Sequence, residues 1–284
     1  MSDITLIDDS EQSSLVTNGL AVNGEMYLKK EGSTDAGSIV VYDSGAWKTF
    51  ANEYSASFAN AYSVDFDGAN DFVNCGDVTA LNSAANFSVS MWVNFQSFVT
   101  NSYGFNIFLG SGTSSGNRFL LNAVRSSNTL CNRLEVYFCE VGASIVGTSL
   151  GLTTNTWYHM AVYKSGSNMS FYLDNTLMDS RTNAPTSGSA TGSNFAIGRG
   201  IYNGAYSSNI LADEVAVWDS DQSSNKDSIY NSGLPSDISS LNPVHWWRMG
   251  DDDSGTGTTI TDQGSGGNNG TLTNGPTFSS DVPS

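Results

Sequence analysis

The chain of 284 residues has little positive charge, little proline and few cysteines, and it lacks an apolar run long enough to cross a bilayer. Its 11 lysine and arginine residues stand against 28 aspartate and glutamate residues, which gives a formal net charge of −17. Such a charge repels phosphate backbones and anionic membrane surfaces, so we expect neither nucleic acid nor a membrane as a partner. Most acidic proteins carry such an excess of negative charge on a solvated surface that keeps them soluble, and we expect the same here. The excess would also favour binding of divalent cations.

The three cysteines, Cys75, Cys131 and Cys139, form an odd set without the spacing of a metal site. We expect buried thiols in a protein that folds in a reducing compartment, with a single disulfide as the alternative. The first twenty residues contain neither the basic segment nor the apolar segment of a secretory signal peptide. The sequence therefore predicts that the chain does not use ordinary secretion.

Glycine is abundant, and short segments alternate between apolar and polar residues. One segment, 156–175, predicts a hairpin in which Trp157, His159, Ala161 and Tyr163 share a buried face, so we expect a structural role for His159. Other strands are predicted at 62–76, 87–95, 105–109, 118–124, 133–139 and 194–198. So many strands, with turns between them, favour an all-β antiparallel sandwich over alternating strands and helices.

The remaining segments define four regions. Residues 1–22 form a polar N-terminal arm that we expect to become ordered only against a partner. Residues 23–55 form a small β attachment unit with short strands at 26–29, 38–42 and 47–50. The sandwich covers 56–235 and includes one short helix near 221–230. Residues 236–284 form a C-terminal segment with predicted strands at 241–250 and 270–278 that completes the sandwich.

The order of five motifs resembles the laminin-G-like branch of the concanavalin A-like lectin/glucanase superfamily. These are DFDGANDFV (65–73), FSVSMWV (87–93), TWYHMAVYKSGSNMSFYLDN (156–175), FAIGRG (195–200) and ILADEVAVWDSD (210–221). The segment HWWRMG (245–250) and the acidic, glycine-rich loop after it resemble the strand and loop that usually open such a domain. The resemblance therefore implies a circularly permuted jelly roll, with the truncated start of a second domain as the alternative.

The small N-terminal unit and its VYDSGAW segment (41–47) resemble virion structural proteins of tailed phages. This implies a non-enzymatic capsid decoration or fibre component, made in the host cytoplasm and displayed on the virion surface. It would bind other virion proteins through its N-terminal region and form a homo-oligomer, and its lectin-like domain would adhere to host-surface glycans. The alternatives are a free carbohydrate-binding lectin and a glucanase-like hydrolase.

A hydrolase of this fold needs two carboxylates on one strand face. Glu135 and Glu140 are five residues apart, and Asp213 and Glu214 are adjacent, so we expect each pair to point to opposite faces of its strand. The sequence therefore predicts that the chain is not an enzyme.

A calcium site is predicted because Asp213 lies on an apolar strand face, where an ionised carboxylate is costly unless it is paired or bound to a cation. Oxygen ligands in flexible loops suit calcium. The expected ligands are Asp67, Asp71, Asp213, Asp262 and Asn268. The alternative is that Asp213 caps backbone amides or pairs with Arg199 or Lys164.

Carbohydrate binding requires aromatic side chains beside polar loops, because sugars present apolar CH faces and hydroxyl edges. The candidate contacts are Tyr103, Tyr202, Tyr206 and Trp246.

Overall fold

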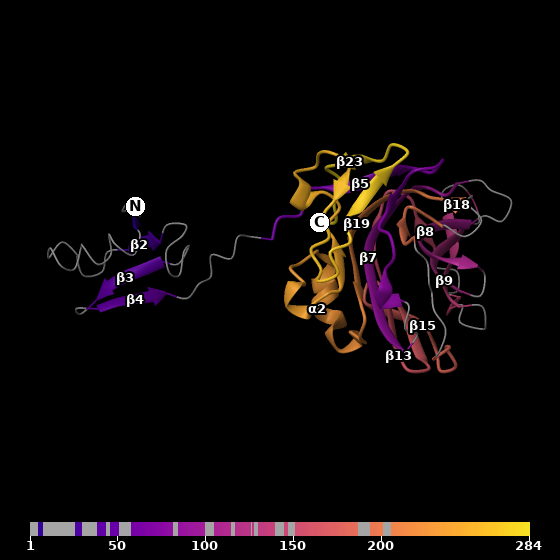
Figure 1. Cartoon of the computed structure of the whole chain (residues 1–284), viewed down its shortest axis with the longest axis horizontal. Helices are drawn as coiled ribbons and strands as arrows, with labels where there is room; N and C mark the ends of the chain where they lie inside the picture. Colours follow the sequence, from indigo (N-terminus) through magenta and orange to yellow (C-terminus); the bar gives the residue numbers. More distant parts are fainter. Residues whose placement is uncertain are drawn as a thin grey trace. The chain divides into compact units, whose positions relative to one another are not determined.

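The computed structural model of the chain forms two compact units, Met1–Ala59 and Asn60–Ser284 (Figure 1). In the first unit it describes four strands, at 5–7, 26–29, 39–43 and 46–50. Further along it describes residues 58–81, 85–99, 105–114, 117–125, 127, 130–139, 145–146, 151–186, 194–200 and 206–284.

The first unit contains a small sheet whose described strands run in the order β1 (Thr5–Ile7), β2 (Met26–Lys29), β3 (Ile39–Asp43) and β4 (Ala46–Phe50). The last three confirm the strands predicted at 26–29, 38–42 and 47–50. The first strand was not predicted, because three residues are too few to establish an alternating pattern. It pairs in parallel with β2, so residues 5–7 of the expected arm belong to a sheet of this unit.

The second unit is an antiparallel sandwich of two sheets, which confirms the predicted fold class. The first, the β7 sheet, has the order β15-β14-β13-β7-β19-β5-β23, and β20 also pairs with β19. Its strands are β5 (Ser63–Asp67), β7 (Asn86–Ser97), β13 (Trp157–Ser165), β14 (Asn168–Leu173), β15 (Thr176–Arg181), β19 (Asn209–Trp218), β20 (His245–Trp247) and β23 (Thr277–Ser279).

The second sheet, the β9 sheet, has the order β11-β10-β9-β8-β16-β6-β22-β21, and β12 also pairs with β10. Its strands are β6 (Phe72–Asn74), β8 (Phe105–Ser114), β9 (Asn117–Arg125), β10 (Leu130–Phe138), β11 (Ile145–Val146), β12 (Leu152–Thr153), β16 (Ala196–Ile197), β21 (Thr259–Ile260) and β22 (Gly270–Thr273). A separate pair, β17 (Arg199–Gly200) and β18 (Tyr206–Ser207), contacts β8.

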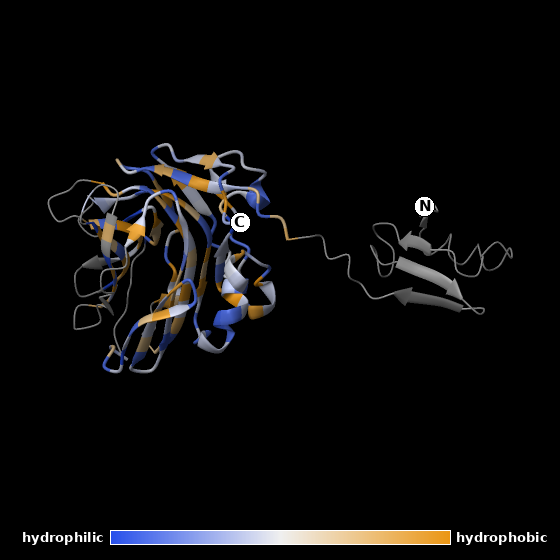
Figure 2. Cartoon of the chain, turned by 180° about the vertical axis from the view of Figure 1, so that it is seen from behind, coloured by the Kyte–Doolittle hydropathy of each residue, from blue (hydrophilic) through white to orange (hydrophobic). Residues whose placement is uncertain are grey.

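The core lies between the two sheets because successive strand residues point to opposite faces. Figure 2 shows the resulting mixture of hydrophobic and hydrophilic residues along the strands. Phe87 of β7 crosses the gap, with its ring centroid 5.7 Å from that of Phe119 and 4.9 Å from that of Phe138 in the β9 sheet. All three side chains are fully buried, and aromatic contacts of this kind stabilise the packing beyond their buried area.

The predicted hairpin at 156–175 is formed by β13 and β14, but the core-facing residues of β13 are Met160 and Val162 rather than the expected set. His159 and Tyr163 are buried on the opposite face of the sheet. A helix, α2 (Lys226–Tyr230), brings Tyr230 to 5.6 Å from the His159 ring. The alternating pattern predicted correctly which residues of β13 share a face. Because both faces of β13 are buried, the pattern could not predict which face packs against the core.

The C-terminal segment pairs with strands of both sheets. Strand β20 pairs with β19, and β22 pairs with β6. Strand β23 pairs with β5 (Figure 1). The fully buried Trp247 stacks between His245 and Phe195, at centroid distances of 5.2 and 5.6 Å. The single strand predicted at 270–278 is divided into β22 and β23 by a turn with positive φ at Asn274 and Gly275. The circular permutation itself stays a prediction.

The helix predicted near 221–230 is confirmed, as a 3₁₀ turn at Ser223–Asn225 followed by α2. The three cysteines are free thiols with buried side chains, as expected. Within the described part of the chain, no helix has the length and apolar character that crossing a bilayer requires.

His159 should make the protein sensitive to acid. Burial lowers its pKa to about 3, whereas the ordinary value is 6.5. Between these values the unfolded chain binds a proton that the folded chain does not, so stability falls as the pH drops from 6.5 to 3, by up to about 1.4 kcal/mol per pH unit.

We expect His159→Phe, which keeps a ring beside Trp92 and Tyr230, to remove this contribution. Urea unfolding of both proteins between pH 6.5 and pH 3 measures the two slopes. Equal slopes would show that His159 titrates normally in the folded protein.

Candidate functional site

The outer face of the β9 sheet carries a group of polar and aromatic side chains. Cross-strand pairing aligns Phe105 with Val124 and Val124 with Arg133, and the next row aligns Asn122 with Glu135. One row further along, Tyr137 pairs with Leu120. Because paired residues share a face, these side chains point away from the core, which takes Leu121, Leu134 and Val136 instead.

Glu135 is the centre of this group. Its side chain is only 4% exposed, and its carboxylate has three partners, two hydrogen-bond donors and one arginine. Asn122 Nδ2 and Tyr137 Oη donate hydrogen bonds of 3.0 and 2.9 Å to Oε2, and Arg133 Nε lies 2.7 Å from Oε1. Burial, with the nearby Glu135 charge, raises the pKa of Tyr137 to about 12. The phenol therefore stays protonated and holds its ring in one position.

Aromatic and guanidinium groups surround this carboxylate. The Arg118 guanidinium lies 4.7 Å from the centroid of the Tyr137 ring, and the Arg133 side chain is 42% exposed. At the edge of the group, the half-buried rings of Phe105 and Tyr206 meet edge to face at 5.9 Å. We name Phe105, Arg118, Arg133, Glu135, Tyr137 and Tyr206 the arginine–tyrosine face. It combines ring surfaces with fixed hydrogen-bond donors, the two kinds of group that a sugar needs.

Strands β17 and β18 cover the neighbouring part of the same sheet. A Cβ atom placed on Gly200 would come within 2.6 Å of Ile107, and one on Gly110 would come within 2.9 Å of the Arg199 carbonyl oxygen. Only glycine allows two backbones to approach so closely. This packing positions Tyr206 beside Phe105.

The four predicted sugar contacts have different outcomes. Tyr206 belongs to the arginine–tyrosine face, while Tyr103 and Tyr202 lie outside the described residues. The prediction for Trp246 is wrong, because this side chain is buried with 5% exposure, its indole N–H is bonded to Glu214, and Arg248 covers its ring. A run of two tryptophans could not reveal which elements would cover them.

A second polar group lies on β19, where the strand exchanges one partner for another. Residues 209–212 pair with β5, residues 215–217 pair with β20, and the register with β7 shifts between Asp213 and Ala216. Glu214 has φ +47°, which turns it out of the strand alternation. The expectation that Asp213 and Glu214 point to opposite faces is therefore wrong. Their carboxylates meet that of Asp251, with all three oxygens within 4.8 Å of one another.

Arg248 neutralises part of this carboxylate cluster. Its Nε donates to Glu214 at 3.1 Å and its Nη2 donates to Asp251 at 3.2 Å. Burial raises the pKa of Asp213 well above its ordinary value, and the adjacent Glu214 raises it further. Burial also raises the pKa of Glu214 to about 7, although Arg248 opposes the shift. One basic side chain is therefore too little to keep three buried carboxylates ionised.

The cluster fits a hard cation in the type of its ligands. Asp213 Oδ1 accepts the Glu214 amide at 2.8 Å, but Oδ2 is buried and makes no hydrogen bond of ordinary geometry. The buried side-chain amide of Asn60 lies close enough to Asp213 to lower its pKa, but it too makes no hydrogen bond of ordinary geometry. Carboxylate and amide oxygens are the ligands that calcium prefers. The alternative for Asp213 holds in part, since one oxygen caps an amide. Lys164 instead binds the carbonyl oxygens of Ala85 and Gly166.

The structure does not bring the other predicted calcium ligands to this cluster. Asp67 and Asp71 close the turn around Gly68, where Asp71 accepts the Asp67 amide at 3.2 Å and Asp67 accepts the Ala69 amide at 2.7 Å. Glu214 and Asp251, which do lie beside Asp213, were not predicted. Their proximity depends on the bulge in β19, which leaves no mark in the alternating pattern.

Asp262 has a structural role. It accepts hydrogen bonds from His245 Nδ1 at 2.7 Å and from three backbone amides, those of Trp246, Gly264 and Asn268. Burial alone would raise its pKa, but these donors outweigh burial and lower it. Asp262 is not among the carboxylates that meet at the cluster, and Asn268 donates its amide to the Asp77 carbonyl oxygen. These two residues tie the glycine-rich loop to β20.

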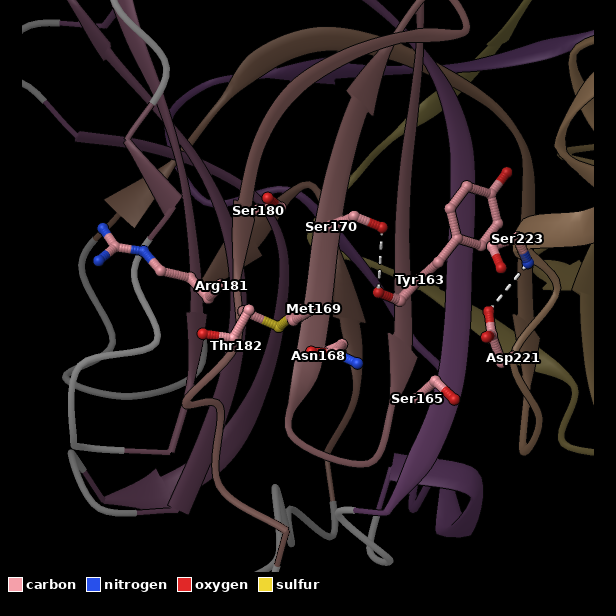
Figure 3. A pocket seen from close by; sticks show the side chains of 10 residues that line it. All are labelled: Tyr163, Ser165, Asn168, Met169, Ser170, Ser180, Arg181, Thr182, Asp221 and Ser223. Atoms are coloured by element: carbon pink, nitrogen blue, oxygen red, sulfur yellow. Dashed lines mark hydrogen bonds between the residues drawn. The ribbon is translucent and has the colours of Figure 1, made fainter.

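A groove of about 430 Å³ lies at the edge of the β7 sheet, between β14, β15 and the segment after β19 (Figure 3). Hydroxyl groups and one charge of each sign line it, from Ser165, Asn168, Ser170, Ser180, Arg181, Thr182, Asp221 and Ser223. The aromatic residue in its wall, Tyr163, is only 2% exposed. The groove therefore lacks an open ring face.

Comparison with known proteins identifies the fold. Residues 67–226, more than half of the chain, match a laminin G family model described as "Concanavalin A-like lectin/glucanases superfamily". No curated protein matches the sequence. A crystal structure of a "putative carbohydrate binding protein" from Bacteroides ovatus superimposes with a TM-score of 0.57 at 19% identity, covering 92% of this chain and 71% of that protein.

Two further solved structures are more distant. A heptameric SAP-like pentraxin from Limulus polyphemus has a TM-score of 0.47 at 16% identity, covering 60% of this chain and 82% of that one. The CBM40 domain of a Ruminococcus gnavus IT-sialidase has a TM-score of 0.43 at 9% identity, covering 59% and 96%. The family match covers strands of both sheets, from β6 to β19, and the arginine–tyrosine face. The chain therefore belongs to the concanavalin A-like lectin/glucanase superfamily.

Proposed function

We propose that the chain is a non-enzymatic virion structural protein, a capsid decoration or fibre component, whose sandwich binds host-surface glycans through the arginine–tyrosine face. The observation that carries the glycan part is the arrangement around Glu135, which fixes Tyr137 and Arg133 beside the Phe105–Tyr206 pair. Rigid aromatic and hydrogen-bonding groups lose little entropy when a ligand binds, so such a face favours affinity. The description of the Bacteroides ovatus protein names the same class of ligand.

The chemistry of the face supports binding rather than hydrolysis. A glycosidase needs two carboxylates roughly 5 to 9.5 Å apart, one on each side of the scissile bond. Glu135 is the one carboxylate among the six residues that define the face, and its oxygens are occupied by Asn122, Tyr137 and Arg133. It therefore supports the face and is not available as an acid or a nucleophile.

The glycan proposal predicts that Tyr206→Ala weakens binding. Loss of one ring contact should cost about 1.4 kcal/mol, which is a tenfold weaker Kd. Glycans selected on an array with the intact chain would be titrated against both proteins by calorimetry. Tyr172→Ala is the matched control, because this half-buried tyrosine contacts Tyr163 on the other sheet. An array without any bound glycan would refute glycan binding, and equal losses in both variants would move the site elsewhere.

The virion role rests on the separate four-stranded unit that precedes the sandwich and on the VYDSGAW segment within it. A sheet of so few residues needs a further surface to pack against, and another virion protein or a second copy of the chain would supply one. The N-terminal unit would then attach the protein, while the sandwich faces outward.

The expected result is that mass spectrometry of purified particles finds the chain at a fixed ratio to the main capsid or tail proteins. Immunogold labelling with an antibody against the sandwich should mark the particle surface. Particles that contain none of the chain would refute the virion role and leave the free lectin.

Calcium at the carboxylate cluster is part of the proposal. Asp213, Glu214, Asp251 and Asn60 would hold the ion, which would supply the positive charge that Arg248 alone does not provide. Because Asp251 also accepts the amides of Ala61 and Tyr62, at 2.8 and 3.1 Å, a bound ion would strengthen the entry of the chain into β5.

Calcium at one hundred times its Kd should stabilise the protein by about 2.7 kcal/mol. Asp213→Asn should abolish this gain without lowering stability in EDTA, since the amide replaces a carboxyl group whose ionised form burial disfavours. Asp262→Asn, the matched control, should lower stability with and without calcium, because it weakens four hydrogen bonds. Melting curves with calcium and with EDTA measure both, and a calcium shift that survives in Asp213→Asn would exclude this cluster.

A further inference from the structure

The arginine–tyrosine face is unusually basic for this chain. The chain carries a net charge of −17 and contains only six arginines. Two of them, Arg118 and Arg133, lie on the outer face of the adjacent strands β9 and β10, whereas Arg125 pairs with the core residue Cys131 on the other face. Two arginines on one face of so acidic a chain make this face locally basic.

The charges of the face are also layered. Glu135 is its one carboxylate and is 4% exposed, whereas the Arg133 side chain is 42% exposed. The half-buried Arg118 places its guanidinium 4.7 Å from the centroid of the Tyr137 ring. The negative charge is therefore withdrawn from solvent, whereas the Arg133 side chain stays partly open to it.

Both guanidinium groups are held before any ligand arrives. The Arg133 side chain is fixed by its ion pair with Glu135, and Arg118 by the ring of Tyr137, whose hydroxyl is in turn bonded to Glu135. A planar guanidinium fork matches a carboxylate, and a fixed fork loses little entropy on binding. A neutral sugar would not require two fixed guanidinium groups, because hydrogen bonds of ordinary strength can recognise it.

We propose that the ligand of the arginine–tyrosine face is an acidic saccharide that carries carboxylate groups. The inference rests on the proposed glycan binding and adds the class of sugar. The rings of Tyr137, Phe105 and Tyr206 take the apolar faces of the sugar, and Arg118 and Arg133 take its carboxylates. The net charge of the chain disfavours dense polyanions at long range, so the positive charge acts only on a ligand that fits the face.

The experiment compares two matched pairs of probes on the full chain: oligogalacturonate with its methyl ester, and sialyllactose with lactose. Each pair differs in a carboxylate but keeps the neutral sugar framework. We expect the acidic member of at least one pair to bind tenfold or more tightly than the neutral member, with an advantage that declines as salt increases. A heparin-derived oligosaccharide serves as a sulfated probe.

Arg133→Ala and Arg118→Ala should each reduce the preference for the acidic probe about tenfold. Arg133→Ala also leaves Glu135 without its ion-pair partner, which can lower the stability of the protein. Two variants avoid this loss: Arg133→Lys keeps a positive charge beside Glu135, and Arg118→Ala leaves the Glu135 contacts in place. Arg181→Ala, on β15 of the other sheet, is the matched control and should leave the preference unchanged. Melting temperatures confirm that each variant is folded.

The outcomes separate the two proposals. Equal affinity for acidic and neutral probes would overturn the acidic ligand while glycan binding stands. Absence of binding to every probe and to the glycan array would overturn both. Equal effects of Arg133→Ala and Arg181→Ala would show that charge in general, and not this face, is responsible, and equally tight binding of the sulfated probe would overturn the preference for carboxylates.

Discussion

The sandwich depends on the pairing of β19, the central strand of the β7 sheet. All its residues after Asn209 are buried, and it pairs with β7 along one edge. Along the other edge its first half pairs with β5 and its second half with β20, so a strand from residue 63 onward and a strand near residue 246 share one partner. The register shift between Asp213 and Ala216 makes this exchange geometrically feasible. The same irregularity creates the carboxylate cluster, so a structural requirement and a candidate ion site have one origin.

The arginine–tyrosine face and the carboxylate cluster differ in how their buried carboxylates are stabilised. Glu135 has hydrogen bonds from Asn122 and Tyr137 and an ion pair with Arg133, and its negative charge orders side chains that face solvent. Asp213 keeps one buried oxygen without a donor beside Glu214, and burial raises the pKa values of both carboxyl groups. A satisfied network makes a rigid platform, whereas an unsatisfied one attracts a proton or a cation.

The sequence predicted the fold well because the sandwich strands carry strong alternation. The hairpin at 156–175, the long strand at 87–95 and the small strands of the first unit all emerged from the pattern of side chains. The strand at 5–7 and the division of 270–278 did not, since short elements depend on pairing partners that are distant in the sequence.

The sites were less predictable for the same reason. Tyr206 was predicted as a sugar contact because it is an aromatic residue beside polar residues, and this stays a prediction. Tyr137 and Arg118 were not predicted, because they meet only after β9 and β10 pair. Trp246 was misjudged because its burial depends on Glu214 and Arg248. Asp213 and Glu214 were assigned to opposite faces because a regular strand has no positive φ, and Glu214 does. Local pattern identifies elements, whereas sites arise where irregular backbone and long-range pairing coincide.

The way the chain enters the sandwich has a mechanical consequence. Asp251 holds the amides of Ala61 and Tyr62, and β5 then runs between β19 and β23, with Ser63 bonded to the Asp281 carbonyl oxygen. Tension applied to the residues before Asn60 would act along β5 and load its ladders on both sides in shear. Many hydrogen bonds would resist together instead of opening one by one. Tension on the segment before β5 would therefore be resisted by both ladders of β5 at once.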